Sequence, residues 1–337
     1  MKGWIRAVIA ICVLLWFTGV SAQKVWNAIG NGGDTEAADK SILDESFYSW
    51  SGPNALARST LLERQEQLQY KCDQMTKDKI LEKIQDPEAF RNLLVDEKHK
   101  LLYCYVPKVA CTNWKRVLMV ATGIWKGSSP LDIPADLAHS SGTFKRLSNY
   151  TMPEIEKKLI AYNKLIVVRH PLERLVSAYR NKFEAKNEKS SMYFQSRFGR
   201  KIIKKYRNNA TEESLLKGDD VTFGEFIDFI TDNNENFIRN EHWKSISELC
   251  HPCLVNYNLV SKYETLMEDA TEILERINAS SILFPIRPQN SEPTAKILDK
   301  YYSTLSLNQL RNLSKFYRLD FYLFDYSLED VLGFSIA

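Results

Sequence analysis

The chain has 337 residues, of which 44% are hydrophobic and 26% are charged, and this composition is typical of folded globular proteins. Its 45 Lys and Arg against 42 Asp and Glu give a net charge of +3, which is too balanced for a dedicated nucleic-acid-binding protein. Six cysteines are too few for a disulfide framework to replace a hydrophobic core. We expect one large α/β domain with a tail, or two domains at most.

An uncharged run at residues 7–22 follows the basic residues Lys2 and Arg6. It is shorter than the roughly 20 residues that span a bilayer, and the small residues at its end also suit signal-peptide cleavage. Both interpretations place the chain in the secretory pathway, and the basic start favours a cytoplasmic N-terminus with a lumenal body. We therefore predict a cytoplasmic tail at 1–6, a signal-anchor or signal peptide at 7–23, a stem at 24–94 and a lumenal domain at 95–337.

Glycosylation sequons agree with a lumenal body. Four N-x-S/T triplets without a central proline begin at Asn149, Asn209, Asn278 and Asn312. Each triplet alone is a weak signal, but together with the N-terminal segment they predict glycan sites.

Five cysteines lie outside the apolar run, and this odd number leaves at least one thiol free if all pairing is intramolecular. Cys250 and Cys253 form a Cys-x-x-Cys motif that suits a redox pair, half a zinc site or a local disulfide. Zinc needs about four ligands and no second such motif occurs, so we predict no metal. In an oxidising lumen, a structural disulfide between Cys250 and Cys253 is favoured.

The predicted elements alternate between strands and helices. Residues 23–60 suit a stem, and residues 61–94 are charged and helix-prone with a break near Pro87. We then expect strands at 101–106 and 164–168, shorter strands at 254–257 and 259–260, and helices at 112–120, 152–162, 171–183, 223–230, 266–277 and 307–317. Strands separated by helices predict an α/β fold with a central parallel sheet flanked by helices.

The first strand-to-helix junction has the sequence YVPKVACTNWKR, at residues 105–116. Lys108 lies in its loop, and Thr112 lies where a helix is expected to begin. Unpaired N–H groups at a helix start bind anions, so this junction suits a phosphate. The glycines of a Walker loop are missing, which counts against a nucleotide triphosphatase. The alternative is a surface lysine beside an N-capping threonine.

The second junction has the sequence VVRHPLERLVSAYR, at residues 167–180. Arg169 lies at the carboxyl end of a strand, where open α/β sheets bind ligands. Ser177 follows two helical turns later and can reach the same anion, which Arg can bind with two parallel hydrogen bonds. The alternative is an ion pair between Arg169 and Glu173, with Ser177 packed in a helix interface. Two such junctions indicate a ligand with two phosphate-type groups.

These motifs resemble the Golgi carbohydrate sulfotransferases of the HNK-1 and chondroitin/dermatan 4-O-sulfotransferase family. The most specific segments are YCYVPKVACTNWKRVLM, VVRHPLERLVSAYRNKF, FGRKIIKKYR and EHWKSISELCHPCLVNY with LVSKYETLMED, within a resemblance that extends from about Val95 to the C-terminus. The wording of the first segment is most similar to the chondroitin 4-O branch. The resemblance implies a P-loop-like sulfotransferase fold that uses 3′-phosphoadenosine 5′-phosphosulfate (PAPS).

The resemblance also implies two donor-binding segments. The 5′-phosphosulfate loop comprises Pro107, Lys108, Val109, Ala110, Cys111, Thr112 and Asn113. The 3′-phosphate site comprises Arg169, His170, Pro171, Leu172, Glu173, Arg174, Leu175, Val176 and Ser177. One departure is visible, because His170 stands where relatives have an acidic residue.

A sulfuryl transfer needs a charged group at the leaving phosphate and a base for the acceptor hydroxyl. We assign the first role to Lys108 and the second to His139, with His242 as the runner-up. The basic stretch at 199–207 suits an anionic acceptor, although a solvated helix face is the alternative. Its candidate substrate-binding residues are Arg200, Lys201, Lys204 and Lys205.

The predicted activity is transfer of a sulfuryl group from PAPS to a glycan hydroxyl, in first place the 4-OH of GalNAc in chondroitin. Dermatan, terminal GalNAc and the glucuronate 3-OH are alternative acceptors. A lumenal phosphotransferase or a non-catalytic glycan-binding protein are alternatives from other classes. The expected location is the Golgi membrane, as a single-pass type II protein with a glycosaminoglycan or glycoprotein glycan acceptor and no nucleic-acid partner.

Overall fold

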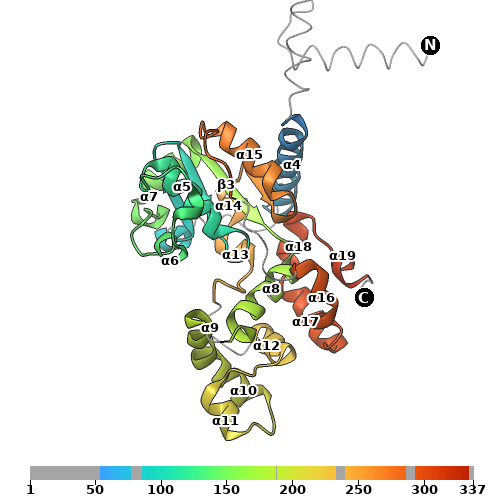
Figure 1. Cartoon of the computed structure of the whole chain (residues 1–337). Helices are drawn as coiled ribbons and strands as arrows, with labels where there is room; N and C mark the ends of the chain where they lie inside the picture. The colour runs from blue at the N-terminus through green and yellow to red at the C-terminus, as the bar shows by residue number, and fades with distance from the viewer. Residues whose placement is uncertain (1–53, 77–85, 187, 233–239, 286–292, 334–337) are drawn as a thin grey trace, which may run out of the picture. The chain divides into compact units, whose positions relative to one another are not determined.

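The computed structural model describes residues 54–76, 86–186, 188–232, 240–285 and 293–333 (Figure 1). These residues belong to one compact unit, Pro53–Ala337. The predicted tail and signal-anchor, and the stem as far as residue 53, lie outside them. Within the described ranges, no helix has the length and apolar character needed to cross a membrane.

A four-stranded sheet lies at the centre of the unit, in the order β1-β2-β3-β4. The strands are β1 (Leu93–Asp96), β2 (Leu101–Cys104), β3 (Asn163–Val168) and β4 (Leu259–Lys262). β1 is antiparallel to β2, whereas β2, β3 and β4 are mutually parallel. The predicted α/β class, with a mainly parallel sheet flanked by helices, is confirmed. The strand predicted at 254–257 is wrong, because Pro252 starts the short helix α14 (Pro252–Val255) there.

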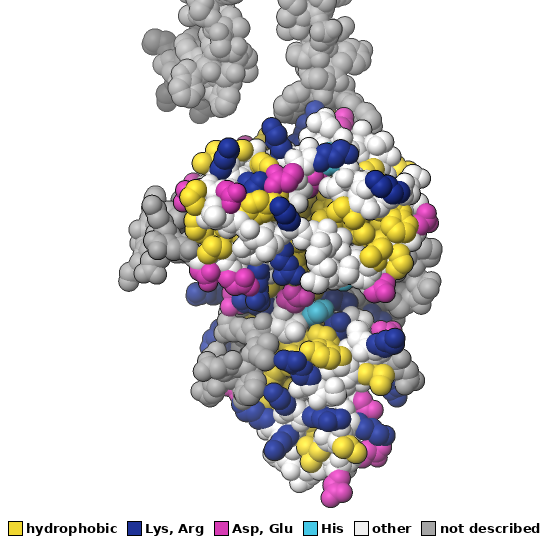
Figure 2. All heavy atoms as spheres, turned by 90° about the vertical axis from the view of Figure 1, so that its left-hand side faces the viewer, with side chains coloured by type: hydrophobic (Ala, Val, Ile, Leu, Met, Phe, Trp, Pro, Cys, Tyr) yellow, Lys and Arg dark blue, Asp and Glu magenta, His cyan; other side chains and the backbone are white. Residues whose placement is uncertain are grey.

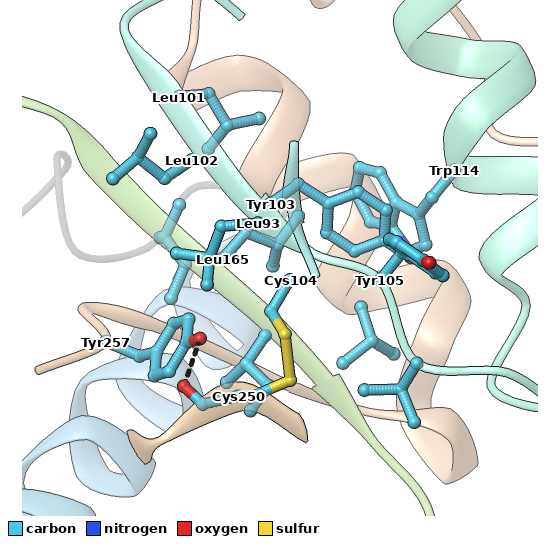
Figure 3. Close-up of a cluster of buried hydrophobic side chains, with 14 of the residues drawn as sticks. Leu93, Leu101, Leu102, Tyr103, Cys104, Tyr105, Trp114, Leu165, Cys250 and Tyr257 are labelled. Atoms are coloured by element: carbon cyan, nitrogen blue, oxygen red, sulfur yellow. Dashed lines mark hydrogen bonds between the residues drawn. A yellow bond between two sulfur atoms is a disulfide. The ribbon is translucent and has the colours of Figure 1, made fainter. Parts of the chain in front are cut away.

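The helices around the sheet bury a continuous apolar core. Figure 3 shows Tyr103 of β2 beside Trp114 of α5 (Cys111–Thr122), with their ring centroids 6.0 Å apart. The Tyr257 hydroxyl donates to the Cys250 carbonyl on the other side of the cluster, at 2.8 Å. The other helices on this core are α4 (Ala55–Thr76), α7 (Met152–Ala161), α13 (Ile246–Cys250), α15 (Leu266–Arg276) and α18 (Arg318–Phe324).

The predicted disulfide between Cys250 and Cys253 is wrong. Cys250 pairs with Cys104 of β2, and Cys253 pairs with Cys72 of α4. Cys250 ends α13 against the sheet, and the left-handed His251 (φ 45°) then turns the chain into α14, so that the two cysteines reach different partners. Cys111 is the free thiol among the described residues, as the odd count required, and it is buried.

Helix α4 belongs to the compact unit, which begins well before the boundary predicted near Val95. Its Leu61 and Leu68 are buried in the sheet core. Arg64 donates to the buried Asp269 carboxylate of α15 at 2.7 Å, and the Cys72 disulfide adds a covalent link. The sequence predicts this helix as part of the stem, because charged and polar residues dominate its composition.

A second apolar cluster is formed by helices that follow β3. Trp243 lies inside it, in contact with the rings of Phe183, Phe198 and Phe226. The contributing elements are α8 (Pro171–Tyr179), a π-helical segment (Arg180–Glu184), α9 (Lys189–Phe194), a second π-helical segment (Gln195–Gly199), α10 (Arg200–Tyr206), α12 (Phe223–Thr231), α16 (Leu298–Tyr302) and α17 (Leu307–Phe316). The remaining helices are α6 (Ala135–Ala138), α11 (Glu212–Lys217) and α19 (Glu329–Leu332), with 3-10 turns at Pro87–Phe90, Pro130–Asp132, Leu147–Asn149, Tyr263–Thr265 and Thr294–Ile297.

Candidate active site

The loop between β2 and α5 has the backbone of an anion cradle without its usual glycines. Lys108 (φ 74°) and Ala110 (φ 62°) both adopt the left-handed conformation. Such strain in non-glycine residues is concentrated at functional sites. Ala110 caps α5 without a side-chain hydrogen bond, which leaves the first N–H groups of the helix for a ligand. Together with the helix dipole, these groups favour an anion at this loop.

The second junction meets this loop through Arg169. The buried guanidinium binds the Glu173 carboxylate at 3.1 and 3.2 Å, and it donates to the Lys108 carbonyl at 3.3 Å. It also lies over the Tyr263 ring, 4.2 Å from the centroid. The ion pair with Glu173 that sequence analysis gave as an alternative is therefore present. It holds Arg169 against the first loop, so the two junctions form one site.

Two neighbouring cavities open at this meeting point, with volumes of about 740 and 570 Å³. Lys108, Arg169 and Ser177 line both cavities. Both volumes lie within the range of ligand pockets. A ligand with two anionic groups can thus contact both junctions.

Lys108 is held at a position where its charge is costly without a ligand. Burial, together with the nearby charges of Lys182 and Arg169, lowers the pKa of Lys108 to about 8. An anion bound beside Lys108 would reverse this effect, because an opposite charge favours the protonated amine. The lowered pKa is consistent with a built anion site.

His139 contacts the first loop through both ring nitrogens. Its Nε2 lies 2.9 Å from Thr112 Oγ1, and its Nδ1 lies 3.3 Å from Lys115 Nζ. Since an ammonium group only donates, Nδ1 accepts and Nε2 donates its hydrogen to Thr112. Burial and the Lys115 charge lower the pKa of His139 to about 4, so the ring is neutral. This arrangement leaves no free lone pair on His139 and turns the Thr112 hydrogen toward other acceptors.

His242 has the opposite arrangement. Its Nδ1 lies 2.7 Å from Asn240 Oδ1, and that oxygen also accepts from the His242 backbone N–H at 3.0 Å. Nδ1 therefore carries the hydrogen, and Nε2 keeps its lone pair. The ring lines the 570 Å³ cavity. Burial, with the charges of Lys182 and Lys108, lowers the pKa of His242 to about 2, so the imidazole is neutral.

A profile of the sulfotransferase family matches residues 91–327, most of the chain. The chain belongs to the sulfotransferase family. Carbohydrate sulfotransferase 11 of Mus musculus is 46% identical over 251 residues, which cover 73% of this chain and 70% of the relative. Carbohydrate sulfotransferase 11 of Danio rerio is 41% identical over 272 residues, 80% of this chain and 76% of the relative. Carbohydrate sulfotransferase 9 of Homo sapiens is 41% identical over 240 residues, 70% of this chain and 53% of the relative. No solved structure matches the chain.

The sulfotransferase family uses PAPS as its donor, and the predicted donor segments contact the cavities only in part. Pro107, Ala110, Cys111 and Thr112 line the 570 Å³ cavity, and Glu173 lines the 740 Å³ cavity. Asn113 instead donates to the Pro285 carbonyl at 3.2 Å. The apolar members of the two segments are buried in the cores, namely Val109, Leu172, Leu175 and Val176. Pro171 is buried at the first turn of α8.

Arg174 is the structural clamp of this sulfotransferase site. Its fully buried guanidinium donates to the backbone carbonyls of Pro107 at 3.0 Å, Lys244 at 2.7 Å and Glu241 at 2.7 Å. It therefore fixes the donor loop to the segment that bears His242. All three hydrogen bonds of the Arg174 guanidinium go to backbone carbonyls, and Arg174 lines neither of the two cavities.

His170, which was predicted to bind the 3′-phosphate with the rest of its segment, also has a structural position. Its Nδ1 accepts from the Leu172 N–H at the start of α8, and its Nε2 lies 2.8 Å from the Ser327 carbonyl. The ring packs edge-on against Phe321 and Tyr326. Burial lowers the pKa of His170, so its ring is neutral at neutral pH. It caps the helix as an acidic residue would, and it also holds the C-terminal segment.

The basic stretch on α10 does not join the site. The side chains of Arg200, Lys201, Lys204 and Lys205 are exposed, and none lines either cavity. Lys205 pairs with Asp232 at 2.8 Å. In Figure 2, Lys and Arg side chains are spread over the lower part of the face in view, at the height where α10 and α11 lie in Figure 1. Of the sequon asparagines, Asn149, Asn209 and Asn278 are exposed and Asn312 is half-buried in α17.

Several cavity residues were missed by sequence analysis, namely Lys115, Arg146, Asn181, Lys182, Glu241 and Tyr263. Lys115 lies one helical turn after Thr112 and Lys182 follows Ser177 on the next element, so helical spacing from the two motifs could have indicated both. Within the described ranges, no cluster of three or more His, Cys, Asp or Glu side chains is arranged to hold a metal.

Proposed function

We propose that this sulfotransferase transfers a sulfuryl group from PAPS to the 4-OH of GalNAc in chondroitin. Relatives that cover most of the chain bear the name carbohydrate sulfotransferase, which supports a glycan acceptor. The observation that carries the donor assignment is that Arg169 joins two anion-binding junctions. PAPS has one anionic group at the 3′ position of its ribose and another at the 5′ position. The similarity of the first motif to the chondroitin 4-O branch supports the choice of acceptor.

Four residues of the two junctions would hold the donor. Lys108, Thr112 and the N–H groups at the start of α5 would bind the 5′-phosphosulfate, and Arg169 with Ser177 would bind the 3′-phosphate. When bound, PAPS supplies the sulfuryl group and a phosphate leaving group. The charge of Lys108 then stabilises the negative charge that develops on the leaving oxygen.

We assign the general base to His242, reversing the order in which sequence analysis placed the two histidines. His242 Nε2 takes the proton of the acceptor hydroxyl. At the same time the hydroxyl oxygen bonds to sulfur, and the bond from sulfur to the leaving phosphate oxygen breaks. Asn240 holds the ring in the required tautomer. Neutralisation of Lys108 by the bound donor raises the pKa of His242 toward the range of an effective base. His139 orients the Thr112 hydroxyl.

We also propose that the protein is a single-pass type II membrane protein of the Golgi with its catalytic domain in the lumen. The uncharged run after a basic start supports an anchor. Two disulfides support an oxidising compartment. The exposed sequon asparagines Asn149, Asn209 and Asn278 are proposed glycan sites.

The test is transfer of radiolabelled sulfate from PAPS by the purified protein, residues 25–337. The acceptors are desulfated chondroitin, dermatan, heparosan and a glycan with terminal GalNAc, each followed by disaccharide analysis. We expect label on the GalNAc 4-OH of chondroitin. Lys108→Met is expected to abolish transfer while leaving the thermal unfolding midpoint close to that of wild type.

Each other outcome changes a defined part of the proposal. Label only on dermatan, terminal GalNAc or glucuronate would keep the donor assignment and replace the acceptor. Absence of transfer and of PAPS binding by folded protein would overturn the enzyme assignment and favour a glycan-binding protein.

A further inference from the structure

Lys182 is a buried lysine that no carboxylate contacts directly among the described residues, although Glu188 and Glu241 lie near enough to act on its charge. Only 7% of its surface is exposed, and it lines the 570 Å³ cavity. Its amine lies 4.6 Å from the centre of the Phe194 ring, and no hydrogen bond or ion pair joins it to another described residue. A buried charge without a partner is unfavourable unless a ligand compensates it.

The backbone around Lys182 is held in an uncommon conformation. Lys182 lies in the π-helical segment Arg180–Glu184, and such bulges are frequent at functional sites. The buried Gln195 side chain donates to the carbonyls of Phe183 at 3.0 Å and Ala185 at 3.2 Å. These bonds fix the segment, so the position of Lys182 does not depend on the ligand.

Lys115 approaches the same cavity from α5. It is 8% exposed, and its amine lies 4.2 Å from the centre of the Tyr105 ring and 3.3 Å from His139 Nδ1. Neither of these partners has a negative charge. Two ammonium groups, one from each core cluster, thus line one cavity without a carboxylate bound to either.

The charges of the two cavities differ. The 570 Å³ cavity is lined by five basic residues and one acidic residue, Glu241, whereas the 740 Å³ cavity has three basic and four acidic residues. Lys108, Arg169, Thr112, Ser177 and the start of α5 suffice for the donor's anionic groups. The remaining basic charge of the smaller cavity therefore lies beside the base His242, where the acceptor must bind.

We infer that Lys182, together with Lys115, forms an acceptor subsite that binds the carboxylate of a uronic acid next to the sugar that receives the sulfuryl group. This inference rests on the proposed function and names the part of the acceptor that is recognised. The subsite favours an acceptor with a carboxylate beside the reacting sugar over a neutral glycan. By binding the carboxylate, Lys182 sets which sugar of the polymer lies at the reaction centre, and His242 contacts the hydroxyl of that sugar.

The test compares chondroitin with carboxyl-reduced chondroitin, in which each carboxylate is a hydroxymethyl group. Wild type is expected to lose roughly 10- to 100-fold in kcat/KM on carboxyl reduction, the range expected for one charged hydrogen bond. Lys182→Met is expected to lose a similar factor in kcat/KM on chondroitin relative to wild type. The variant's kcat/KM on the reduced polymer should then be little lower than its value on chondroitin. Lys182→Arg, which keeps the charge, should restore part of the preference. Lys157→Met, at an exposed position of α7, is the matched control.

The outcomes separate this inference from the function on which it depends. If Lys182→Met lost the same factor on both polymers and raised the KM for PAPS, Lys182 would bind the donor's sulfuryl group and the inference would be wrong. Equal turnover of both polymers by wild type would also overturn it. Absence of transfer by wild type to either polymer would overturn the proposed function itself. A thermal unfolding midpoint and product affinity equal to wild type in Lys182→Met would show that the variant folds.

Discussion

The two disulfides are nested, and this arrangement sets their contribution to stability. The inner bridge, Cys104–Cys250, closes a separation of 146 residues, and the outer bridge, Cys72–Cys253, closes 181. Once the inner bridge exists, the outer one closes only the chain at 72–104 and 250–253. Loop-closure entropy then gives about 4 kcal/mol for either bridge while the other is present, and about 9 kcal/mol for both. A local Cys250–Cys253 bridge would give only about 2 kcal/mol.

The assay is urea unfolding of three variants, followed by tryptophan fluorescence and circular dichroism. Both cysteines of a bridge are changed to Ala together, so that no new thiol can pair with Cys111. We expect each double variant to lose about 4 kcal/mol in the free energy of unfolding, and the variant lacking both bridges to lose more than the two losses combined. A loss below about 1 kcal/mol on removal of Cys72–Cys253 would refute the reasoning, because α4 would then add no restraint to the unfolded chain.

Three further predictions concern the site. The affinity for adenosine 3′,5′-bisphosphate, the product of the donor, is expected to fall as pH rises through about 8, because Lys108 is charged below its pKa and neutral above it. Calorimetry between about pH 7 and about pH 9.5 measures this affinity, and a constant value would contradict the prediction. His242→Gln is expected to lower kcat at least about 100-fold with little change in the KM for PAPS, whereas His139→Gln should mainly raise that KM; steady-state kinetics that show the reverse would return the base to His139. Arg174→Met is expected to lower the free energy of unfolding by about 3 kcal/mol, because one buried and two part-buried carbonyls lose their charged donor; a chemical denaturation curve that matches wild type would contradict this role of Arg174.

Strands β2 and β3 could be predicted from the sequence, because each is a continuous apolar run ended by Pro or a polar turn, and so could the helices that follow them. β1 was not predicted, because its residues were assigned to the end of the helix-prone stretch at 61–94. β3 and α8 lie within a few residues of their predicted bounds. The disulfide pairing could not be predicted this way. It depends on the left-handed His251, which separates Cys250 from Cys253, and no local pattern reports that turn.

The same limit applies within the motif at 169–177. The sequence suggests one continuous phosphate-binding segment, but a helix distributes its residues over three directions. Arg169, Glu173 and Ser177, spaced four apart, line the 740 Å³ cavity. Arg174 points back to the first loop, and the apolar residues between them enter the second core cluster. Only knowledge of what packs on each side of α8 separates these roles.

The position of the site between the two core clusters explains its electrostatics. Lys108 and Lys115 come from the loop and helix after β2, whereas Lys182 follows α8, and each lowers the pKa of a neighbouring group at their meeting point. Packing the two clusters together therefore brings like charges close, which opposes folding. Arg174 resists this repulsion by holding neutral carbonyls on both sides. A bound polyanion would remove the repulsion itself, so the feature that makes the free site unfavourable is also the source of its affinity for donor and acceptor.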